Sequence, residues 1–151
     1  MPVVQDVGFL FLAHDHRSYT GASGGPSEDR MGEVKIYAFD VDETLDCSSG
    51  PISIESLVEL RLAGHAVGLC GNWAAVVWHH PYDWWKYVSF LGPIGLDKPG
   101  HLAHMRRYIP ADEYVMVGND PSIKGSSQDA SAAALAGWRF IREDDFAAGV
   151  R

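Results

Sequence analysis

The most informative part of this sequence is Val34-Lys-Ile-Tyr-Ala-Phe-Asp-Val-Asp-Glu-Thr-Leu45. Its first six residues, 34–39, are mostly apolar and include β-branched and aromatic side chains, which predicts a largely buried strand. Asp40 and Asp42 follow that strand directly. Because residues two apart in an extended chain point the same way, both carboxylates can face one site while Val41 turns back toward the core.

The residues that follow alternate between helical and strand patterns. Helices are predicted at 54–62, 73–90, 100–108 and 127–136, and short apolar strands at 66–70, 114–117 and 138–141. Ser53 is the expected N-cap of the first helix and Gly64 its stop, Pro81 must interrupt the second, and Gly137 is the expected stop of the last. This alternation predicts a Rossmann-like three-layer α/β sandwich with a central parallel sheet, in which ligands bind beyond the carboxyl ends of the strands.

The pair of carboxylates has a definite chemistry. Two carboxylates this close repel each other, and a bound Mg²⁺ is a common remedy because hard cations take oxygen ligands. One carboxylate can attack phosphorus and form an acyl phosphate, while the other protonates the leaving oxygen and then activates water. The alternative is an acidic turn that merely caps a strand. The apolar strand before the pair and Thr44-Leu45 after it favour the catalytic interpretation.

With these residues in view, the chain resembles the haloacid dehalogenase (HAD) superfamily. The segment Tyr37-Ala-Phe-Asp-Val-Asp-Glu-Thr-Leu45 is similar to the family's first motif, a hydrophobic strand followed by D-x-D-x-T. The resemblance implies that Asp40 is the nucleophile and Asp42 the general acid and base. It also implies that Mg²⁺ is held by the Asp40 carboxylate and the Asp42 backbone carbonyl. An Asp at the second acidic position is typical of the family's phosphatases and mutases.

The second motif of the family ends a strand with Ser or Thr, and here Cys70 stands at that position. A thiol is a weaker hydrogen-bond donor than a hydroxyl. The backbone N–H groups of Gly71 and Asn72 can still bind phosphate, so these residues and Thr44 are the expected substrate contacts. The alternative is that Cys70 is simply a small buried residue.

A lysine and further acidic residues complete the family pattern. Lys98, in a Lys-Pro pair before a helix, is expected to neutralise the phosphoryl charge. The alternatives are a solvated surface lysine, or Lys124 in the same role. The strand–Gly–Asn–Asp pattern implies that Asp120 is a Mg²⁺ ligand. Asp129 is also expected at the metal, directly or through water, with helix capping as its alternative.

The domain boundaries follow from the position of these motifs. Residues 34–151 are expected to form the catalytic domain, and residues 1–33 an N-terminal extension made of a strand and a Gly/Ser-rich loop. The stretches between the motifs are too short for a separate cap domain. The resemblance then implies an open site, or one closed by another subunit or by the extension. An open site suits a macromolecular substrate or a bulky small molecule.

The segment between the second and third motifs is unusually aromatic, with Trp73, Trp78, Trp84 and Trp85 within thirteen residues. One interpretation is a stacking surface for a base or ring near the site. The other is that these rings pack a helix onto the sheet or form a contact between the subunits of a homo-oligomer. The histidines at 14, 16, 79 and 80 are expected on the surface rather than in a metal site.

Composition limits the class of protein. The 151 residues carry 20 acidic and 12 basic side chains and a net charge of −8, which disfavours nonspecific binding of nucleic acid or anionic membrane. Two cysteines are too few for a disulfide framework, so a cytoplasmic protein with free thiols is expected. No segment approaches the length of a membrane span.

Together these features predict Mg²⁺-dependent hydrolysis of a phosphomonoester through an aspartyl-phosphate, with a phosphorylated small molecule or macromolecule as substrate. The alternative is a HAD-fold binding or regulatory protein, which the missing Ser/Thr and the long fourth motif favour. Retention of both Asp40 and Asp42 speaks against it, because binding alone does not need the second carboxylate. Phosphoryl transfer to an acceptor, as in mutases, is a third option.

Overall fold

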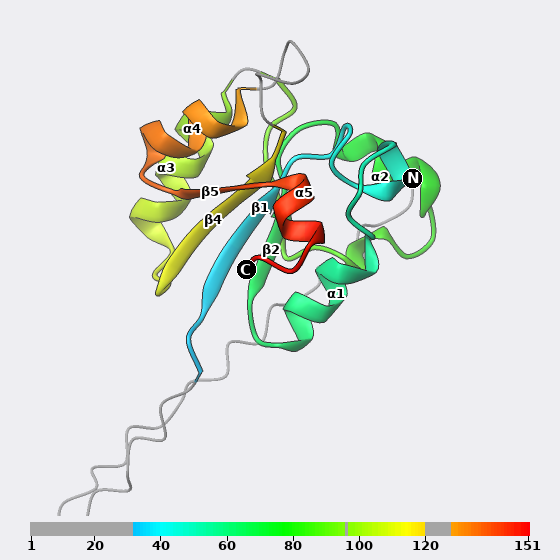
Figure 1. The fold of residues 1–151 in the computed structure, drawn as a ribbon, viewed down its shortest axis with the longest axis horizontal. Helices are drawn as coiled ribbons and strands as arrows, with labels where there is room; N and C mark the ends of the chain where they lie inside the picture. The colour runs from blue at the N-terminus through cyan, green and yellow to red at the C-terminus, as the bar shows by residue number, and fades with distance from the viewer. Residues whose placement is uncertain (1–31, 96, 120–127) are drawn as a thin grey trace, which may run out of the picture.

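The computed structural model describes residues 32–95, 97–119 and 128–151. One sheet of five parallel strands lies at its centre, in the order β3-β2-β1-β4-β5 (Figure 1). The strands are β1 (Lys35–Phe39), β2 (Ala66–Leu69), β3 (Phe90–Leu91), β4 (Glu113–Gly118) and β5 (Arg139–Arg142). The helices are α1 (Glu55–Leu62), α2 (Trp73–His79), α3 (Lys98–Tyr108), α4 (Asp129–Ala136) and α5 (Glu143–Ala147), with 3₁₀ turns η1 (Asp46–Ser48) and η2 (Trp84–Lys86).

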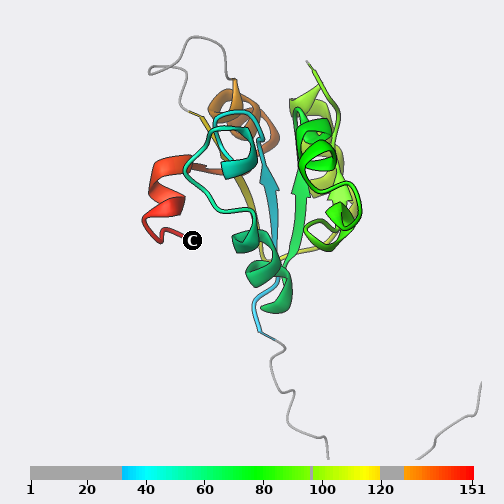
Figure 2. The same ribbon diagram turned by 90° about the vertical axis from the view of Figure 1, so that its right-hand side faces the viewer.

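Helices cover both faces of the sheet. Along β1, Tyr37 and Phe39 belong to one apolar cluster and Ile36 and Ala38 to another, as the alternation of side chains in a strand requires. The first cluster includes side chains of α1, α2 and α5, and the second side chains of α3 and α4. Figure 1 shows α1 and α5 on one side and α3 and α4 on the other, and Figure 2 shows α5 and α3 on opposite sides of β1. The predicted three-layer α/β fold is confirmed, and the described residues contain no separate cap domain.

The register of the central strands sets where the polar loops begin. Phe39 of β1 lies opposite Leu69 of β2 on one side and Val117 of β4 on the other. Because all three strands are parallel, the residues that follow them emerge at one edge of the sheet. This is the edge at which ligands bind in open α/β sheets.

Several predicted boundaries differ from the structure. The helix predicted at 73–90 is instead α2, η2 and the two-residue edge strand β3. The helix ends at His79 because Pro81 cannot continue it. β3 and α5 had no sequence prediction, since both are too short to show a period. Helix α1 begins after Ile54, one residue later than a Ser53 N-cap predicts, but the Ser53 hydroxyl still accepts the Glu55 N–H at 3.4 Å.

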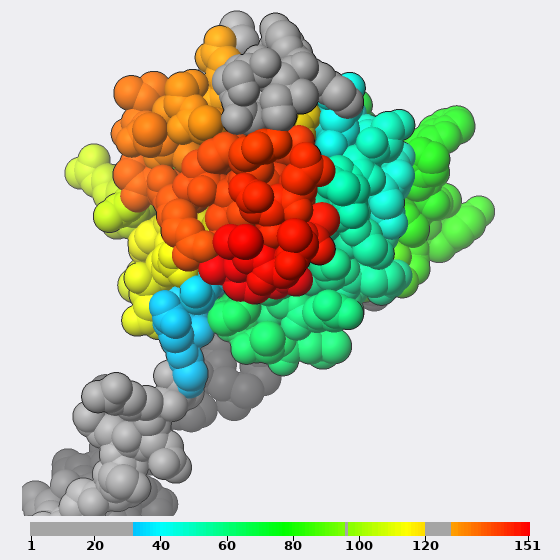
Figure 3. Space-filling model, viewed as in Figure 1, coloured from blue at the N-terminus to red at the C-terminus, as the bar shows by residue number. Residues whose placement is uncertain are grey.

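The predicted stops of two helices are confirmed. Gly64 follows α1 with φ +94°, and Gly137 ends α4 in the left-handed region with φ +69°. In Figure 3 the C-terminal segment that includes α5 covers much of one face of the molecule. Among the described residues no helix is long and apolar enough to cross a membrane. The predicted extension, 1–33, lies outside the described residues apart from its last two positions.

Candidate active site

Three strands deliver the residues of the candidate site to one edge of the sheet. Asp40 follows β1, Asn119 follows β4, and Cys70 follows β2. The backbone ladder continues one residue past β1 and β2, because the Asp40 N–H donates to the Val117 carbonyl at 2.8 Å and the Cys70 N–H to the Phe39 carbonyl at 2.7 Å. These bonds hold the backbone of Asp40 rigidly beside its neighbours.

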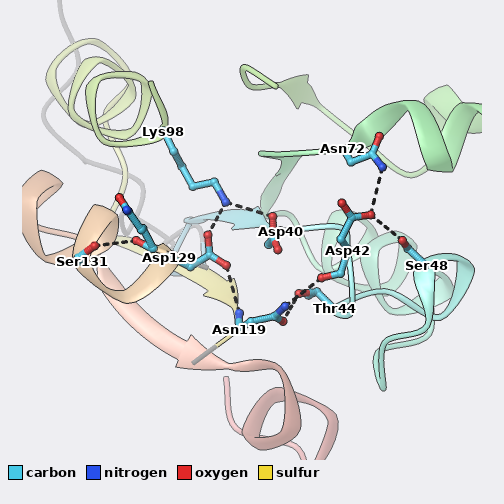
Figure 4. Close-up of polar contacts among 10 residues, drawn as sticks. Asp40, Asp42, Thr44, Ser48, Asn72, Lys98, Asn119, Asp129 and Ser131 are labelled. Carbon is cyan, nitrogen blue, oxygen red and sulfur yellow. Dashed lines mark hydrogen bonds and ion pairs between the residues drawn. The ribbon is translucent and has the colours of Figure 1, made fainter. Parts of the chain in front are cut away.

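Lys98 joins two carboxylates at this edge. Its Nζ lies 3.1 Å from Asp40 Oδ1 and also donates to Asp129 Oδ1 (Figure 4). Asp129 is fully buried, and its second oxygen accepts the Asn119 N–H at 3.1 Å. Asp40 is 8% exposed. Lys98 therefore contacts both carboxylates in a nearly dry site, where the negative charges of Asp40 and Asp129 repel each other.

Burial and the neighbouring charges shift the pKa values of Asp40 and Lys98. Burial, and then the negative charge of Asp129, raise the pKa of Asp40 to about 6 against the attraction of Lys98. Burial by itself lowers the pKa of Lys98, but the two carboxylates outweigh it and raise the pKa above its ordinary value. Lys98 therefore stays charged at neutral pH beside a carboxylate that is costly to ionise. Perturbed groups of this kind cluster at functional sites.

Asp42 lies on the other side of Asp40 and is exposed. Its Oδ1 accepts two hydrogen bonds, from Ser48 Oγ at 2.8 Å and from Asn72 Nδ2 at 3.1 Å. Two donors on one carboxylate oxygen fix the direction of the side chain while the group stays open to solvent. Figure 4 shows Asp42, Ser48 and Asn72 together on this side of Asp40. The two predicted catalytic carboxylates thus belong to one site but have different surroundings.

The turn that carries Asp42 is held from within the protein. Thr44 is fully buried, and its hydroxyl donates to Asn119 Oδ1 at 2.8 Å. Asn119 Nδ2 in turn donates to the Asp42 carbonyl at 3.0 Å. Glu43, between these residues, has a positive φ of 57°, so the turn is locally strained. Thr44, predicted to bind substrate, is instead placed where it positions the Asp42 backbone.

Sequence reasoning missed Asn119 and Ser48. Asn119 links Thr44, Asp42 and Asp129, and its position directly after β4 in a Gly-Asn-Asp turn was the available signal. Ser48 lies in η1 and reaches Asp42 only because the turn folds back on itself, which no local pattern shows.

The loop after β2 approaches the predicted nucleophile closely. Gly71 has a φ of +127°, and a Cβ built on it would lie 2.5 Å from Asp40 Oδ1, so only glycine fits. Its N–H, predicted to bind phosphate, donates to the Pro93 carbonyl at 3.2 Å. Asn72, also predicted to bind substrate, contacts the Asp42 carboxylate.

Cys70 lies where the alternative interpretation placed it. It is fully buried in the apolar cluster that includes Leu102 and Met116. Burial raises the pKa of its thiol to about 12, so it remains protonated. Cys47 is also a free thiol, as expected.

The residues expected to hold Mg²⁺ are only partly described. The Asp40 carboxylate and the Asp42 carbonyl are hard oxygen donors at the same edge, and their chemistry fits this cation. Asp120 and the rival lysine Lys124 lie outside the described residues. Within the described ranges no three His, Cys, Asp or Glu side chains gather as a metal site, and Asp129 is directed at Lys98. A complete magnesium site therefore requires Asp120 or solvent.

The tryptophans of the aromatic segment, residues 73–85, differ in burial: two pack against the core and two are exposed. Trp73 and Trp84 pack against the apolar cluster on the α1 face of the sheet. Trp78, Tyr82 and Trp85 are 83%, 87% and 58% exposed. The first pair stabilises the fold, and the rings of the second group are exposed.

No protein-family model matches the chain, and no curated protein or solved structure matches it either. The function is therefore inferred from the chemistry of the site.

Proposed function

We propose that this chain is a Mg²⁺-dependent phosphomonoester hydrolase of the HAD type that works through an aspartyl-phosphate. The observation that carries the proposal is the contact of Lys98 with Asp40 at the carboxyl edge of the sheet, with Asp42 on the opposite side of Asp40. A carboxylate beside a fixed cation suits attack on a phosphoryl group, and a second, exposed carboxylate suits proton transfer.

The proposed reaction has two displacements. In the first, an Asp40 oxygen bonds to phosphorus, the bond from phosphorus to the leaving oxygen breaks, and the Asp42 carboxylic acid gives its proton to that oxygen. In the second, the Asp42 carboxylate takes a proton from water, the water oxygen bonds to phosphorus, and the bond from phosphorus to Asp40 breaks. Inorganic phosphate leaves and Asp42 is again protonated. Lys98 offsets the charge of the phosphoryl oxygens throughout.

The surrounding residues act by positioning. Ser48 and Asn72 aim the Asp42 carboxylate, and the Thr44–Asn119 pair holds the Asp42 backbone. Asp129 holds Lys98 in place from its buried position. Positioning of this kind is the main contribution that a protein makes to phosphoryl transfer.

Magnesium would be held by the Asp40 carboxylate and the Asp42 carbonyl, with Asp120 as the third protein ligand. When bound it would offset the negative charge of the Asp40 carboxylate and polarise a phosphoryl oxygen. The substrate would be a phosphorylated small molecule or macromolecule. The two free thiols are compatible with a cytoplasmic location.

A HAD-fold binding protein is the second candidate, and one observation favours it. Neither the buried Cys70 nor the Gly71 N–H, which is bonded to Pro93, offers the phosphate donors that the second motif normally supplies.

The experiment that tests the proposal is release of phosphate from an aryl phosphate with and without Mg²⁺. Asp40→Asn is expected to lower turnover by at least about a thousandfold, because its amide cannot attack phosphorus. Asp145→Asn, the same change at an exposed position on α5, is the matched control. Turnover by Asp40→Asn equal to that of the control would exclude the mechanism. No release from any folded sample would favour the binding protein.

A further inference from the structure

A polar pocket lies at the end of the sheet where the parallel strands begin. Its volume is about 400 Å³, at the low end of the range for small-molecule sites. The end of α1, the turn that leads into β2 and the segment from η2 to β3 line it, and its polar side chains are Arg61, His65, Lys86 and Ser89. Figure 1 shows the turn from α1 into β2 at the same end of the sheet as the start of β1.

This pocket is separate from the candidate active site. His65 Nδ1 accepts the N–H of Lys35, the first residue of β1, at 3.3 Å, whereas Asp40 follows the last residue of that strand. A strand rises about 3.3 Å per residue, so five residues place these two backbone positions about 16 Å apart. A ligand in the pocket therefore leaves Asp40 and Lys98 free.

The charge of the pocket is opposite to that of the whole chain. Arg61 and Lys86 belong to its lining, and the described residues that line it include no Asp or Glu. The chain carries a net charge of −8, so a small region of positive charge stands out against a field that repels anions elsewhere. Lys86 also pairs with Asp83 at 2.8 Å, but an ammonium group has three donors and can share them with a second anion.

The two uncharged polar side chains have used their acceptors on the backbone. Ser89 Oγ accepts the Val67 N–H at 3.3 Å, and a hydroxyl that accepts in this way can still donate its own hydrogen. Because His65 Nδ1 accepts the Lys35 N–H, the neutral ring carries its proton on Nε2, where it is a donor. Both side chains therefore offer a ligand hydrogen-bond donors.

Arg61 is held in place and keeps one edge of its guanidinium for a ligand. Its Nη1 donates to the carbonyls of Trp85, at 3.4 Å, and Lys86. Among the described residues Arg61 makes no other hydrogen bond, which leaves Nε and Nη2. Two parallel N–H groups of a guanidinium match the two oxygens of a carboxylate or phosphate.

We propose that this pocket binds the oxyanionic group, phosphate or carboxylate, of a small molecule. Arg61 binds the group in two bonds, Ser89 and His65 donate to it, and Lys86 adds charge. Val58 and Leu62 supply apolar wall for the organic part of the ligand. The inference does not depend on the proposed phosphatase function, because the candidate active site shares no residue with this pocket.

The test is titration of the full chain with sodium phosphate and with sodium succinate, in EDTA, followed by ¹H–¹⁵N NMR. The backbone amides of Lys35 and Val67 report on the pocket, because each bonds to one of its side chains. The amide of Gly71 reports on the candidate active site. Saturable shifts of the Lys35 and Val67 signals are expected, and the ion that binds more tightly identifies the group as phosphoryl or carboxylate.

Three variants connect those shifts to the pocket. Arg61→Gln should weaken binding at least about tenfold, because a bidentate charged contact is lost. Lys86→Gln should weaken it about threefold, because its ammonium is exposed and shared with Asp83. Arg107→Gln is the matched control: Arg107 is an exposed arginine of α3 that does not line the pocket, and its variant should bind as the wild type does.

Four results would overturn the proposal. The first is no shift at Lys35 and Val67 with either ion, and the second is equal shifts with sodium chloride at the same ionic strength. The third is unchanged affinity in Arg61→Gln, or in Lys86→Gln should the first variant fail to fold. The fourth is a shift at Gly71 alone, which would place the anion in the candidate active site and leave the phosphatase proposal standing.

Discussion

Lys98 contacts the carboxylates of both Asp40 and Asp129, but burial first and the charge of Asp129 second still raise the pKa of Asp40. The pKa of Asp40 is about 6 in the folded protein and 3.8 as its ordinary value. Between these values the folded state binds more protons than the unfolded state. The contribution of Asp40 to the free energy of unfolding of the metal-free protein therefore falls as the pH rises from about 4 to about 6. The ionised Asp40 carboxylate thus lowers the stability of the fold, as is common for perturbed groups at functional sites.

Asp40→Asn tests directly how much the ionised Asp40 carboxylate lowers the free energy of unfolding. The amide side chain at position 40 carries no charge at any pH. In EDTA at neutral pH we therefore expect the variant to be more stable than the wild type by on the order of 1–3 kcal/mol. The difference should shrink as the pH falls through about 6 and vanish near 4, where the wild-type carboxyl is also neutral. Denaturant unfolding across this range measures it. A variant less stable than the wild type at neutral pH would contradict the electrostatic picture.

The pairing of Lys98 with Asp129 gives a second prediction. Lys98→Met removes the ammonium that faces a fully buried carboxylate and should cost about 3 kcal/mol of unfolding free energy. Adding Asp129→Asn should recover much of this loss, because the buried charge is then gone. Lys35→Met is the control: its pair with Glu113 is partly exposed and should contribute about 1 kcal/mol or less. Equal costs for the two lysines would show that Lys98 has no special electrostatic role.

At the scale of elements, the loop between β2 and α2 brings its backbone against the side chain of Asp40. Gly71 and Gly64 both have positive φ, and replacement by Ala should cost each about 1 kcal/mol of stability. Only Gly71 has the Asp40 carboxylate within 2.5 Å of the position of a Cβ, whereas Gly64 has nothing within 4 Å. Gly71→Ala should therefore also lower turnover, on the order of a hundredfold. Similar turnover in Gly71→Ala and Gly64→Ala would mean that the close approach is not needed.

The elements also show where local patterns predict well. The strands at 35–39 and 113–118 lie within about a residue of their predictions because each is a run of apolar residues that ends at polar ones. The stops at Gly64 and Gly137 were predictable because a left-handed residue is a local requirement. The structure of the aromatic segment after Trp73 was not predictable in this way. Its division into α2, η2 and β3 depends on which rings pack against the core.

At the scale of the whole molecule, the two apolar layers share one sheet. Tyr37 and Phe39 belong to one layer and Ile36 and Ala38 to the other, so β1 joins the two. A domain of this size normally unfolds in a single step. Loss of packing in either layer should therefore weaken the same transition.

Phe146→Ala and Leu102→Ala test this coupling. Phe146 packs edge-on against the Phe39 ring at 5.1 Å in one layer, and Leu102 is fully buried in the other. Each substitution should cost about 2–5 kcal/mol, with a single transition by circular dichroism and by tryptophan fluorescence. Two separate transitions in either variant would mean that the layers fold independently.

The sequence by itself predicts the order of the strands and helices. It also predicts the carboxylate pair that follows β1. Each depends on contacts between near neighbours: period, caps, turns, and the two-residue repeat that points Asp40 and Asp42 the same way. Lys98 and Asp129 could also be predicted as site residues, but only through the resemblance to the HAD superfamily.

The hydrogen bonds, ion pairs and burial of these residues were decided by the tertiary structure. Lys98 and Asp129 begin α3 and α4, and packing these helices on one face of the sheet brings both side chains to Asp40. The burial of Thr44 and Cys70 and the bond from Asn119 to Asp42 arise in the same way. Hydrogen bonds and desolvation depend on distance in space, and for residues many positions apart only the packing of strands and helices sets that distance.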